Sequence, residues 1–498
     1  MTWFFGNKKS LIAVVVLALI LAAGIRFYDL TDLPLDFAPT RQLFSALKAR
    51  GMYYAMLPAS ENPPFREIAI NQWHSLQVIE PPLIESLVAL TYRVFGEHLW
   101  IARIYSLLFW VLAGIPLFFL AKEIAGPGGA FISLLYYLFL PYGVIASRTF
   151  QPDPLMVALI ATAAWASFHW ANRRDWKWAL ITGILNGLAI FVKNVSVFPL
   201  AFAMLGLVFE FGFVKSIKDK QTWTIAGLSL LPSALYTLYG VVFAGFLGQQ
   251  FAFRFFPQLW LDPGFYLRWL GQIEGVVGFG AFAAGMIGIF VAKRRGMFFL
   301  TGLFAGYIVY GMTFAYHIST HDYYQLPLIP IAALALSPIA ETLLESIAKI
   351  RSGTFVRALL ALLIMLVVSI QLWDVRVTLA RDDWRPDAAF WQGLGEKLGY
   401  SGPVLTIAQD YGYRLAYWGW QEVDSWYDSG DLDLRALDGR KIDLLQRFQQ
   451  QVMGKKYLVI TQLNKLDNQP EIKSYIYKTY PVFAQDKGYV IFDLTKTK

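Results

Sequence analysis

The stretch LIAVVVLALILAAGIRFYDLTDLPLDFAPTRQ, residues 11–42, decides how this chain is organised. It begins with the continuous apolar run Leu11–Ile25 and then turns polar, with Asp36 between Pro34 and Pro39. A plain membrane anchor has no need of a carboxylate at its exit, because ionisable groups near a membrane are costly unless they are paired or functional. The stretch therefore predicts an enzyme that works at a membrane surface.

The composition is that of a membrane protein. Of the 498 residues, 56% are hydrophobic, and the mean hydropathy is +0.46. Cysteine is absent, which excludes disulfides and thiolate metal sites. The net charge is +8. The basic residues lie in loops that flank apolar segments, so they indicate membrane orientation and not binding to nucleic acid.

Apolar segments long enough to cross a hydrocarbon core recur through the first three quarters of the chain, and without water they are expected to be helical. No small-residue cleavage site ends the first of them, so we interpret it as an uncleaved transmembrane helix. We predict eleven spans, at residues 10–27, 99–121, 127–146, 154–171, 177–193, 195–214, 222–247, 271–292, 297–316, 324–346 and 355–373.

The distribution of basic residues supports this map and orients it. With a cytoplasmic N-terminus, most of them fall in cytoplasmic loops, as the positive-inside rule requires. Only Arg148, Lys193, Arg254 and Arg268 fall in the short outer loops. The cytoplasmic set is Lys8, Lys9, Lys122, Arg173, Arg174, Lys177, Lys215, Lys218, Lys220, Lys293, Arg294, Arg295, Lys349, Arg351 and Arg357. An odd number of spans places the C-terminus outside a plasma (inner) membrane.

Two regions are expected outside the bilayer. Residues 374–498 are polar, and their short β-rich runs alternate with helical stretches, which predicts a small α/β domain. Strands are expected at Pro403–Ala408, Tyr457–Thr461 and Tyr489–Leu494. The first outer loop, 28–98, contains two amphipathic segments, Pro39–Leu57 and Pro82–Phe95, which we expect to be helices in the membrane interface. Residues 1–373 form the predicted membrane domain.

Polar residues from several loops and helix ends are expected at the outer face, where they could form one site. This set suits transfer from a phosphorylated lipid, since a carboxylate can serve as general base and cations can stabilise a departing phosphate. The aromatic stretch 251–270 would hold an isoprenoid chain, or would simply anchor the loop at the interface. The set comprises Asp36, Arg41, His74, Glu80, His98, Arg103, Arg148, Asp153, Lys193, His317, His321 and Asp322.

Four motifs resemble those of polyprenyl-phosphate-sugar-dependent glycosyltransferases of the GT-C fold. The most similar group is glycosyltransferase family 39, with the protein O-mannosyltransferases and the aminoarabinose transferases that modify lipid A. The motifs are Pro34-Leu35-Asp36, EPPLIESLVALTYRVFGEHLWIARIYSLLF at 80–109, RTFQPDPLM at 148–156 and HDYYQLPLIP at 321–330. The resemblance covers about residues 1–373 and implies a mainly α, GT-C helical bundle.

The resemblance implies that Asp36 is the catalytic base of an inverting transfer to an acceptor that is a protein, a lipid or a polysaccharide. Two positions depart from the family: Phe37 stands where mannosyltransferases often have glutamate, and Glu80 stands where aminoarabinose transferases have a phosphate-binding lysine. Phosphate binding is therefore reassigned among the cations. The residues predicted to bind donor phosphate or substrate are Arg41, Arg103, Arg148, Asp153, Lys193, His321, Tyr324 and Glu80.

Each of these residues also has a purely structural interpretation. Asp36 and Asp153 could cap helices, Arg103 could snorkel to the membrane surface, and Lys193 could simply end a helix. His317 and His321 are spaced as a metal pair if helical, but no cluster demands a metal, and a divalent cation at the donor phosphate stays open. Two other functions remain as alternatives: a transporter of lipid-linked glycans, or a non-catalytic scaffold on the same fold.

Overall fold

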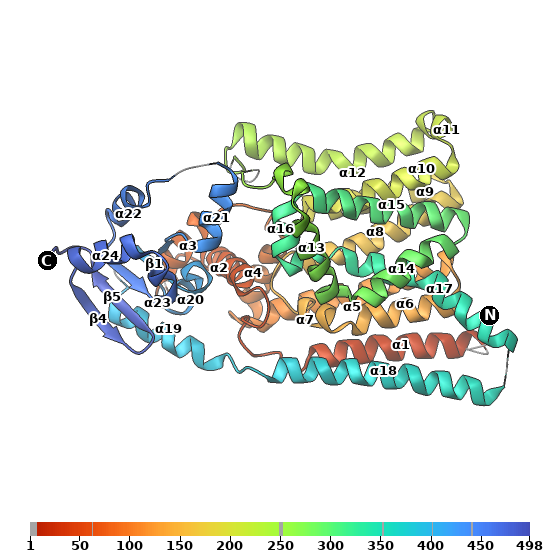
Figure 1. Ribbon diagram of the computed structural model, residues 1–498, viewed down its shortest axis with the longest axis horizontal. Helices are drawn as coiled ribbons and strands as arrows, with labels where there is room; N and C mark the ends of the chain where they lie inside the picture. Colours follow the sequence, from red (N-terminus) through yellow and green to blue (C-terminus); the bar gives the residue numbers. More distant parts are fainter. Residues whose placement is uncertain (1–6, 62, 249–251, 351–352, 401, 440–441) are drawn as a thin grey trace. The chain divides into compact units, whose positions relative to one another are not determined.

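The computed structural model describes residues 7–61, 63–248, 252–350, 353–400, 402–439 and 442–498 (Figure 1). The chain divides into two compact units. The helical unit takes its described residues from Met1–Leu30, Val78–Leu83 and Ala102–Asp382, and the α/β unit takes them from Thr31–Gln77, Ile84–Ile101 and Asp383–Lys498. Two residues named above, Arg351 and Phe251, lie outside the described residues.

The helical unit is built from long apolar helices that run alongside one another (Figure 1). Among its contacts, α9 packs on α8 and α12, α10 packs on α15, and α17 packs on α6 and α14. The elements are α1 (Lys8–Arg26), α5 (Trp100–Ile124), α6 (Pro127–Phe139), α7 (Pro141–Ala146), α8 (Asp153–Arg173), α9 (Trp176–Val192), η1 (Asn194–Ser196), α10 (Val197–Phe211), α11 (Phe213–Ile217), α12 (Lys220–Leu238), η2 (Tyr239–Phe243), η3 (Pro257–Leu261), α13 (Pro263–Val277), α14 (Phe279–Val291), α15 (Arg294–Thr313), α16 (Ala315–Thr320), η4 (Asp322–Gln325), α17 (Leu328–Ile350) and α18 (Thr354–Ala380).

The apolar helices make this an integral membrane protein. By length and composition, eight helices of the described chain could cross a membrane, or nine if the bent pair α13 and α14 is one span. The other two of the eleven predicted spans correspond to the shorter apolar helices α6, of 13 residues, and α9, of 17 residues. The predicted span 271–292 is not one straight helix, since the chain bends by 93° between α13 and α14, where Gly278 has φ 78°.

The predicted split between the fifth and sixth spans lies at Lys193. Helix α9 ends at Val192, and Lys193 is extended, with φ −154° and ψ 115°. The chain re-enters helix through η1 and α10. Because Lys193 is extended, its side chain leaves the backbone in a different direction from that of a residue within α9 or α10.

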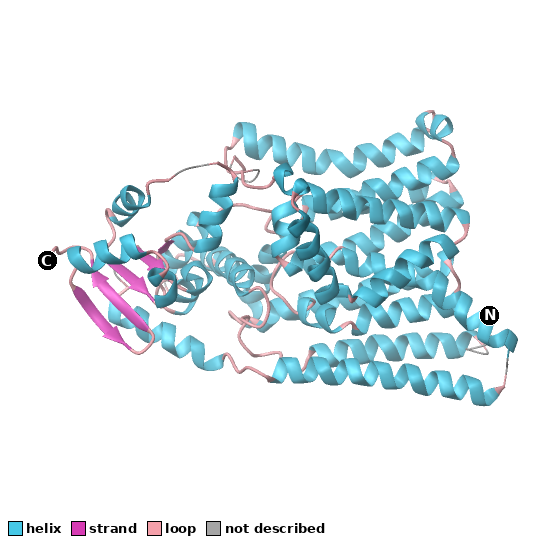
Figure 2. Ribbon diagram, viewed as in Figure 1, coloured by secondary structure: helices cyan, strands magenta, loops and turns pink. Residues whose placement is uncertain are grey.

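The α/β unit carries all the strands of the described chain, gathered in one sheet (Figure 2). The strand order is β2-β1-β3-β5-β4, with β1 parallel to β2 and β3, and β5 antiparallel to β3 and β4. Its elements are α2 (Pro39–Met56), α3 (Arg66–Ser75), α4 (Leu83–Phe95), α19 (Arg385–Leu398), β1 (Val404–Ile407), η5 (Gln409–Gly412), α20 (Tyr413–Trp418), β2 (Val423–Ser425), α21 (Ser429–Leu437), α22 (Leu444–Val452), β3 (Tyr457–Ile460), α23 (Leu463–Asp467), α24 (Pro470–Thr479), β4 (Val482–Asp486) and β5 (Tyr489–Asp493).

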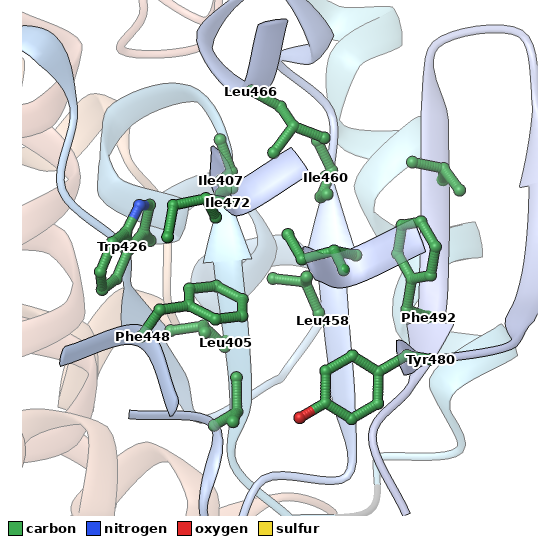
Figure 3. Close-up of a cluster of buried hydrophobic side chains, with 13 residues drawn as sticks. Leu405, Ile407, Trp426, Phe448, Leu458, Ile460, Leu466, Ile472, Tyr480 and Phe492 are labelled. Carbon is green, nitrogen blue, oxygen red and sulfur yellow. The ribbon is translucent and has the colours of Figure 1, made fainter. Parts of the chain in front are cut away.

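The sheet has a hydrophobic cluster on each of its faces, as the prediction of a separate core requires, and Figure 3 shows one of them. Leu405 of β1, Leu458 of β3 and Phe492 of β5 are fully buried there against Phe448 of α22 and Ile476 of α24. The three predicted strands are confirmed as β1, β3 and β5. The strands β2 and β4 were not predicted, because their short sequences lack a clear apolar alternation.

The first outer loop behaves differently from the prediction. Its two predicted helices exist as α2 and α4, but α2 does not lie on a surface, since residues 42–51 are all buried, Lys48 and Arg50 included. Within the α/β unit, α2 packs on α3 and α20. Residues 31–77 and 84–101 therefore group with 383–498, whereas the prediction divided the chain at residue 373.

Arg50 shows why a buried cation is stable in α2. Its Nε lies 2.8 Å from Glu97 Oε1, and its guanidinium donates to the carbonyl oxygen of Tyr417 and stacks on that ring, 3.5 Å from the centroid. Tyr417 in turn donates to Glu97 at 2.6 Å. A buried charge is tolerated when it is paired and hydrogen-bonded in this way.

We expect glycines to control the contact between α10 and α15, because without water small residues let membrane helices approach closely. A Cβ added at Gly302 would overlap the carbonyl oxygen of Phe202. Gly302→Ala should therefore lower the free energy of unfolding by about 1–3 kcal/mol, measured by thermal unfolding in detergent. Gly227→Ala on α12 is the control, since nothing lies within 4 Å of its Cβ; equal stabilities of the two variants would contradict this prediction.

Candidate active site

Lys193 is the centre of a polar group in the helical unit. Its Nζ donates to Asp153 Oδ1 at 2.7 Å and lies 3.9 Å from Glu80 Oε1. It also lies 6.0 Å from the centroid of the Tyr323 ring. The side chains of Lys193, Asp153 and Glu80 are 15%, 1% and 13% exposed. Water therefore screens the attraction between Lys193 and the two carboxylates only weakly. Three of the residues predicted to form the site are thus brought together.

Asp153 does not act as a helix cap. It is the first residue of α8, the N-cap position is Pro152, and no side chain there accepts a capping hydrogen bond. The carboxylate faces Lys193 instead, and its second oxygen has no hydrogen-bond partner within the described chain. The capping interpretation is therefore wrong, and the buried carboxylate is part of the polar group.

A second set of polar side chains comes from α16 and η4, which carry the HDYY motif. The rings of His317 and Tyr324 are stacked with their centroids 5.3 Å apart, and His321 lies 5.9 Å from each of them. Arg254 donates to the hydroxyl of Tyr324 at 3.0 Å. Tyr323, next in the chain, faces both Tyr324 and Lys193, so it links the two sets.

The histidines are held neutral by their surroundings. Burial, with a smaller contribution from the positive Arg254, lowers the pKa of His317 to about 3. Burial also lowers the pKa of His321, while the adjacent Asp322 opposes this shift. The Nδ1 atom of His317 is buried with no hydrogen-bond partner among the described residues. Neutral rings beside Arg254 can accept or donate one hydrogen bond each without adding charge.

The alternative that His317 and His321 form a metal pair, noted from their spacing, finds no support in the geometry. Their rings are stacked 5.9 Å apart at an interplanar angle of 29°, which does not direct two nitrogens at one point. Within the described ranges, no group of three or more His, Asp or Glu side chains is arranged to hold a metal ion. The divalent cation at the donor phosphate stays a prediction.

Two of the predicted phosphate ligands, Arg103 and Arg148, are buried in the helical unit, each 1% exposed. Arg148 donates to the backbone oxygen of Asp29 at 2.9 Å, so it fastens the end of the first helix. Arg103 on α5 does not snorkel to a surface, since its side chain is enclosed. Neither arginine is brought to Lys193 by a contact that the structure shows.

Asp36 and Arg41 belong to the α/β unit, at the start of α2. Gln42 donates through Nε2 to the backbone oxygen of Phe37 at 2.6 Å and to Asp36 Oδ1 at 3.3 Å. Asp36 does not cap the helix: the N-cap is Ala38, in the left-handed region with φ 41°, and it accepts no side-chain bond. Arg41 lies 5.8 Å from the centroid of the Phe44 ring.

Sequence reasoning missed three roles. Arg254 was assigned only to the aromatic loop, whereas the structure places it against Tyr324 of the HDYY motif. Asp32 was not singled out; it is 6% exposed and accepts from the backbone of Trp384 at 3.0 Å. Asp410 had no local signal at all, because its partner Thr40 lies 370 residues away.

The fold defines the class of protein. ArnT from Cupriavidus metallidurans, in the apo state, matches over 97% of this chain and 98% of its own, with a TM-score of 0.62 and 15% identity. The same protein bound to undecaprenyl phosphate gives a TM-score of 0.58 at 15% identity over 98% of each chain. AglB, the oligosaccharyltransferase of Archaeoglobus fulgidus, in complex with an inhibitory peptide and a dolichol-phosphate, matches with a TM-score of 0.56, 13% identity, 97% of this chain and 74% of its own. The chain has the GT-C fold.

The sequence agrees with this class. Residues 79–237 match the family model of dolichyl-phosphate-mannose-protein mannosyltransferases. No curated protein sequence matches the chain. The family model and the fold together confirm the resemblance to GT-C glycosyltransferases of family 39, and they confirm the predicted helical bundle with a small additional sheet domain.

The lowered pKa of His317 predicts a pH-dependent stability. Between about pH 6.5, the ordinary value, and about pH 3 the unfolded chain binds a proton that the folded chain excludes. The free energy of unfolding should therefore fall as the pH falls from 7 toward 5, by up to about 1 kcal/mol per pH unit. Denaturation in detergent at several pH values should show a smaller loss for His317→Gln than for the wild type, whereas equal losses would refute this.

Proposed function

We propose that this protein transfers a sugar from a polyprenyl-phosphate donor to an acceptor, and that Lys193 binds the donor phosphate. The observation that carries this proposal is the position of Lys193 beside Glu80, at 3.9 Å. In aminoarabinose transferases, which this chain resembles, a lysine occupies the place of Glu80. Here an ammonium group reaches the same place from the break between α9 and α10. The missing family lysine would in this way be replaced by one from the break between two other helices.

The chemistry of this group suits a phosphate that gains charge as the sugar leaves. An ammonium has three N–H donors, so a phosphate oxygen can bind Lys193 alongside Asp153, which orients it. Arg254 offers a planar guanidinium that can bind two phosphate oxygens at once. Donors already held in place stabilise the developing charge without having to reorganise during the reaction. The tyrosine hydroxyls of η4 add neutral donors.

An apolar cavity that begins near the break at Lys193 could hold part of a prenyl chain. It lies among α9, α10 and α12 and has a volume of about 270 Å³. Ile190 and Val197, which line it, stand on either side of the break at Lys193. A lipid phosphate bound at Lys193 would therefore have a cavity for its first isoprene units close by. The undecaprenyl phosphate and dolichol-phosphate in the ArnT and AglB structures are lipids of this kind.

For Asp36 we propose the role of general base that accepts the proton of the acceptor nucleophile, in a single inverting displacement at the outer face of the inner membrane. The role rests on the Pro34-Leu35-Asp36 motif and on the position of Asp36 directly before α2. The transferred group would be a hexose or a pentose. Within the described residues, no feature favours the transporter or the scaffold.

Removing the charge of Lys193 should weaken binding of undecaprenyl phosphate, used as the probe. A hydrogen bond to a charged group contributes about 1.5–3 kcal/mol, so Lys193→Gln and Arg254→Gln should each raise the Kd roughly 10- to 100-fold. Arg268→Gln is the matched control, because that arginine forms an exposed pair with Asp262. Thermal unfolding of each variant separates loss of binding from loss of fold. A folded Lys193→Gln protein with unchanged affinity would refute the assignment.

Asp36→Asn should stop turnover while the donor still binds. General bases contribute about 10²- to 10⁴-fold to rates, so the variant should co-purify with a sugar-loaded polyprenyl phosphate, detected by mass spectrometry. The bound lipid should then persist when membrane extract from the source cells is added, whereas the wild type consumes it. A variant as active as the wild type, with no such lipid bound, would overturn the proposed function.

A further inference from the structure

A series of partly buried polar contacts in the α/β unit ends at the first turn of α2. Thr40 Oγ1 donates to Asp410 Oδ1 at 2.9 Å, and Arg414 Nε donates to Asp410 Oδ2 at 2.6 Å. The same arginine donates through a terminal nitrogen to Asp387 Oδ2 at 3.1 Å, and Trp391 Nε1 donates to that oxygen at 2.8 Å. Both carboxylate oxygens of Asp410 thus accept a hydrogen bond, and one of the two donors, Thr40, is on α2.

Asp410 is held in an unusual backbone conformation. It follows β1, and both Asp410 (φ 52°, ψ 43°) and Tyr411 (φ 55°, ψ 27°) lie in the left-handed region, followed by Gly412 at φ 79°. Such conformations persist only where the surroundings determine them. At Gly412 there is no room for a side chain, because an added Cβ would lie 2.6 Å from Thr406 Oγ1. The turn therefore presents the Asp410 carboxylate in one fixed position.

The rest of α2 is anchored by other contacts. Arg50, near its C-terminal end, is held by Glu97 and by Tyr417 of α20. On α3, which packs on α2, Gln72 donates to the backbone oxygens of Ala416 and Gln421. These anchors do not involve the first turn, so they would remain if the contact between Thr40 and Asp410 were removed. Its effect is confined to the turn that follows Asp36.

We infer that Asp410 and Thr40 are positioning residues for Asp36. Thr40 lies four residues after Asp36, and the intervening Ala38 is in the left-handed region. The hydrogen bond to Asp410 fixes Thr40 and so restricts the backbone conformations open to residues 36–39 at the start of the helix. The Asp36 carboxylate is therefore held at one angle to an incoming nucleophile. The residues after residue 373 would then contribute to the reaction itself. This inference rests on the proposed role of Asp36.

The test compares Thr40→Val, which removes the hydroxyl at nearly constant shape, with Thr40→Ser, which keeps it. The rate measured is the single-turnover decay of the co-purified donor lipid after membrane extract of the source cells is added to the purified full-length protein. A small misplacement of a reacting group can cost up to about 100-fold, so Thr40→Val should slow the decay at least about tenfold. Thr40→Ser should decay at nearly the wild-type rate.

Two further measurements distinguish positioning from a structural effect. The Kd for undecaprenyl phosphate should be unchanged in Thr40→Val, because the donor phosphate is assigned to other residues. Thr495→Val is the matched control: its hydroxyl donates to Asp493 at 2.6 Å in the same unit, and its loss should leave the rate unchanged. Asp410→Ala should slow the decay as Thr40→Val does, and combining the two substitutions should add nothing further.

The failures can be told apart. If Asp36→Asn abolishes the decay but a folded Thr40→Val protein is as fast as the wild type, the positioning inference is wrong and the proposed function stands. If Asp36→Asn itself leaves the decay unchanged, the proposed function is wrong, and the inference that rests on it is wrong as well. Equal slowing in Thr40→Val and Thr40→Ser would also overturn the inference, because the hydroxyl would then have no role.

Discussion

The ion pair between Lys193 and Asp153 is the interaction on which the arrangement of the helical unit's polar group depends. A buried carboxylate that is 1% exposed is stable only if it is paired, since transfer of an isolated charge from water into a protein interior is costly. The pair joins the start of α8 to the end of α9, and it sets where the chain must leave the helix. Glu80, Tyr323 and, through Tyr324, Arg254 are arranged around the ammonium that this pair orients.

In the α/β unit, α2 has the corresponding role. A helix that contains Lys48 and Arg50 in its buried part can fold only against partners that satisfy those charges, and α20, which follows β1 through η5, together with Glu97, supplies them for Arg50. The first outer loop and the C-terminal sheet form one compact unit, which contains these contacts. The unit that contains Asp36 is therefore assembled from parts of the chain that are more than 300 residues apart.

The predicted helices and strands agree with the structure where the signal is local. Apolar segments of sufficient length, the break at Lys193 and the runs that became β1, β3 and β5 could be read from hydropathy and periodicity. The surface helix expected at Pro39–Leu57 was wrong, because amphipathic spacing does not reveal whether a partner covers the polar face. For Asp153 the sequence left a helix cap and a site residue open, because a cap and a buried ion pair place the same residue type at a helix start; the structure shows the ion pair.

The sequence alone determined the class of this protein: the motifs around Asp36, at 80–109 and at 321–330, and the apolar segments, indicate the GT-C fold, which the comparisons confirm. Only the tertiary structure decided which cation stands beside Glu80, and which residue holds the first turn of α2. The reason is physical: hydropathy and turn chemistry act between near neighbours, whereas the partners of Lys193 and Thr40 lie 40 and 370 residues away. Such pairs form only once folding has brought these distant parts of the chain together.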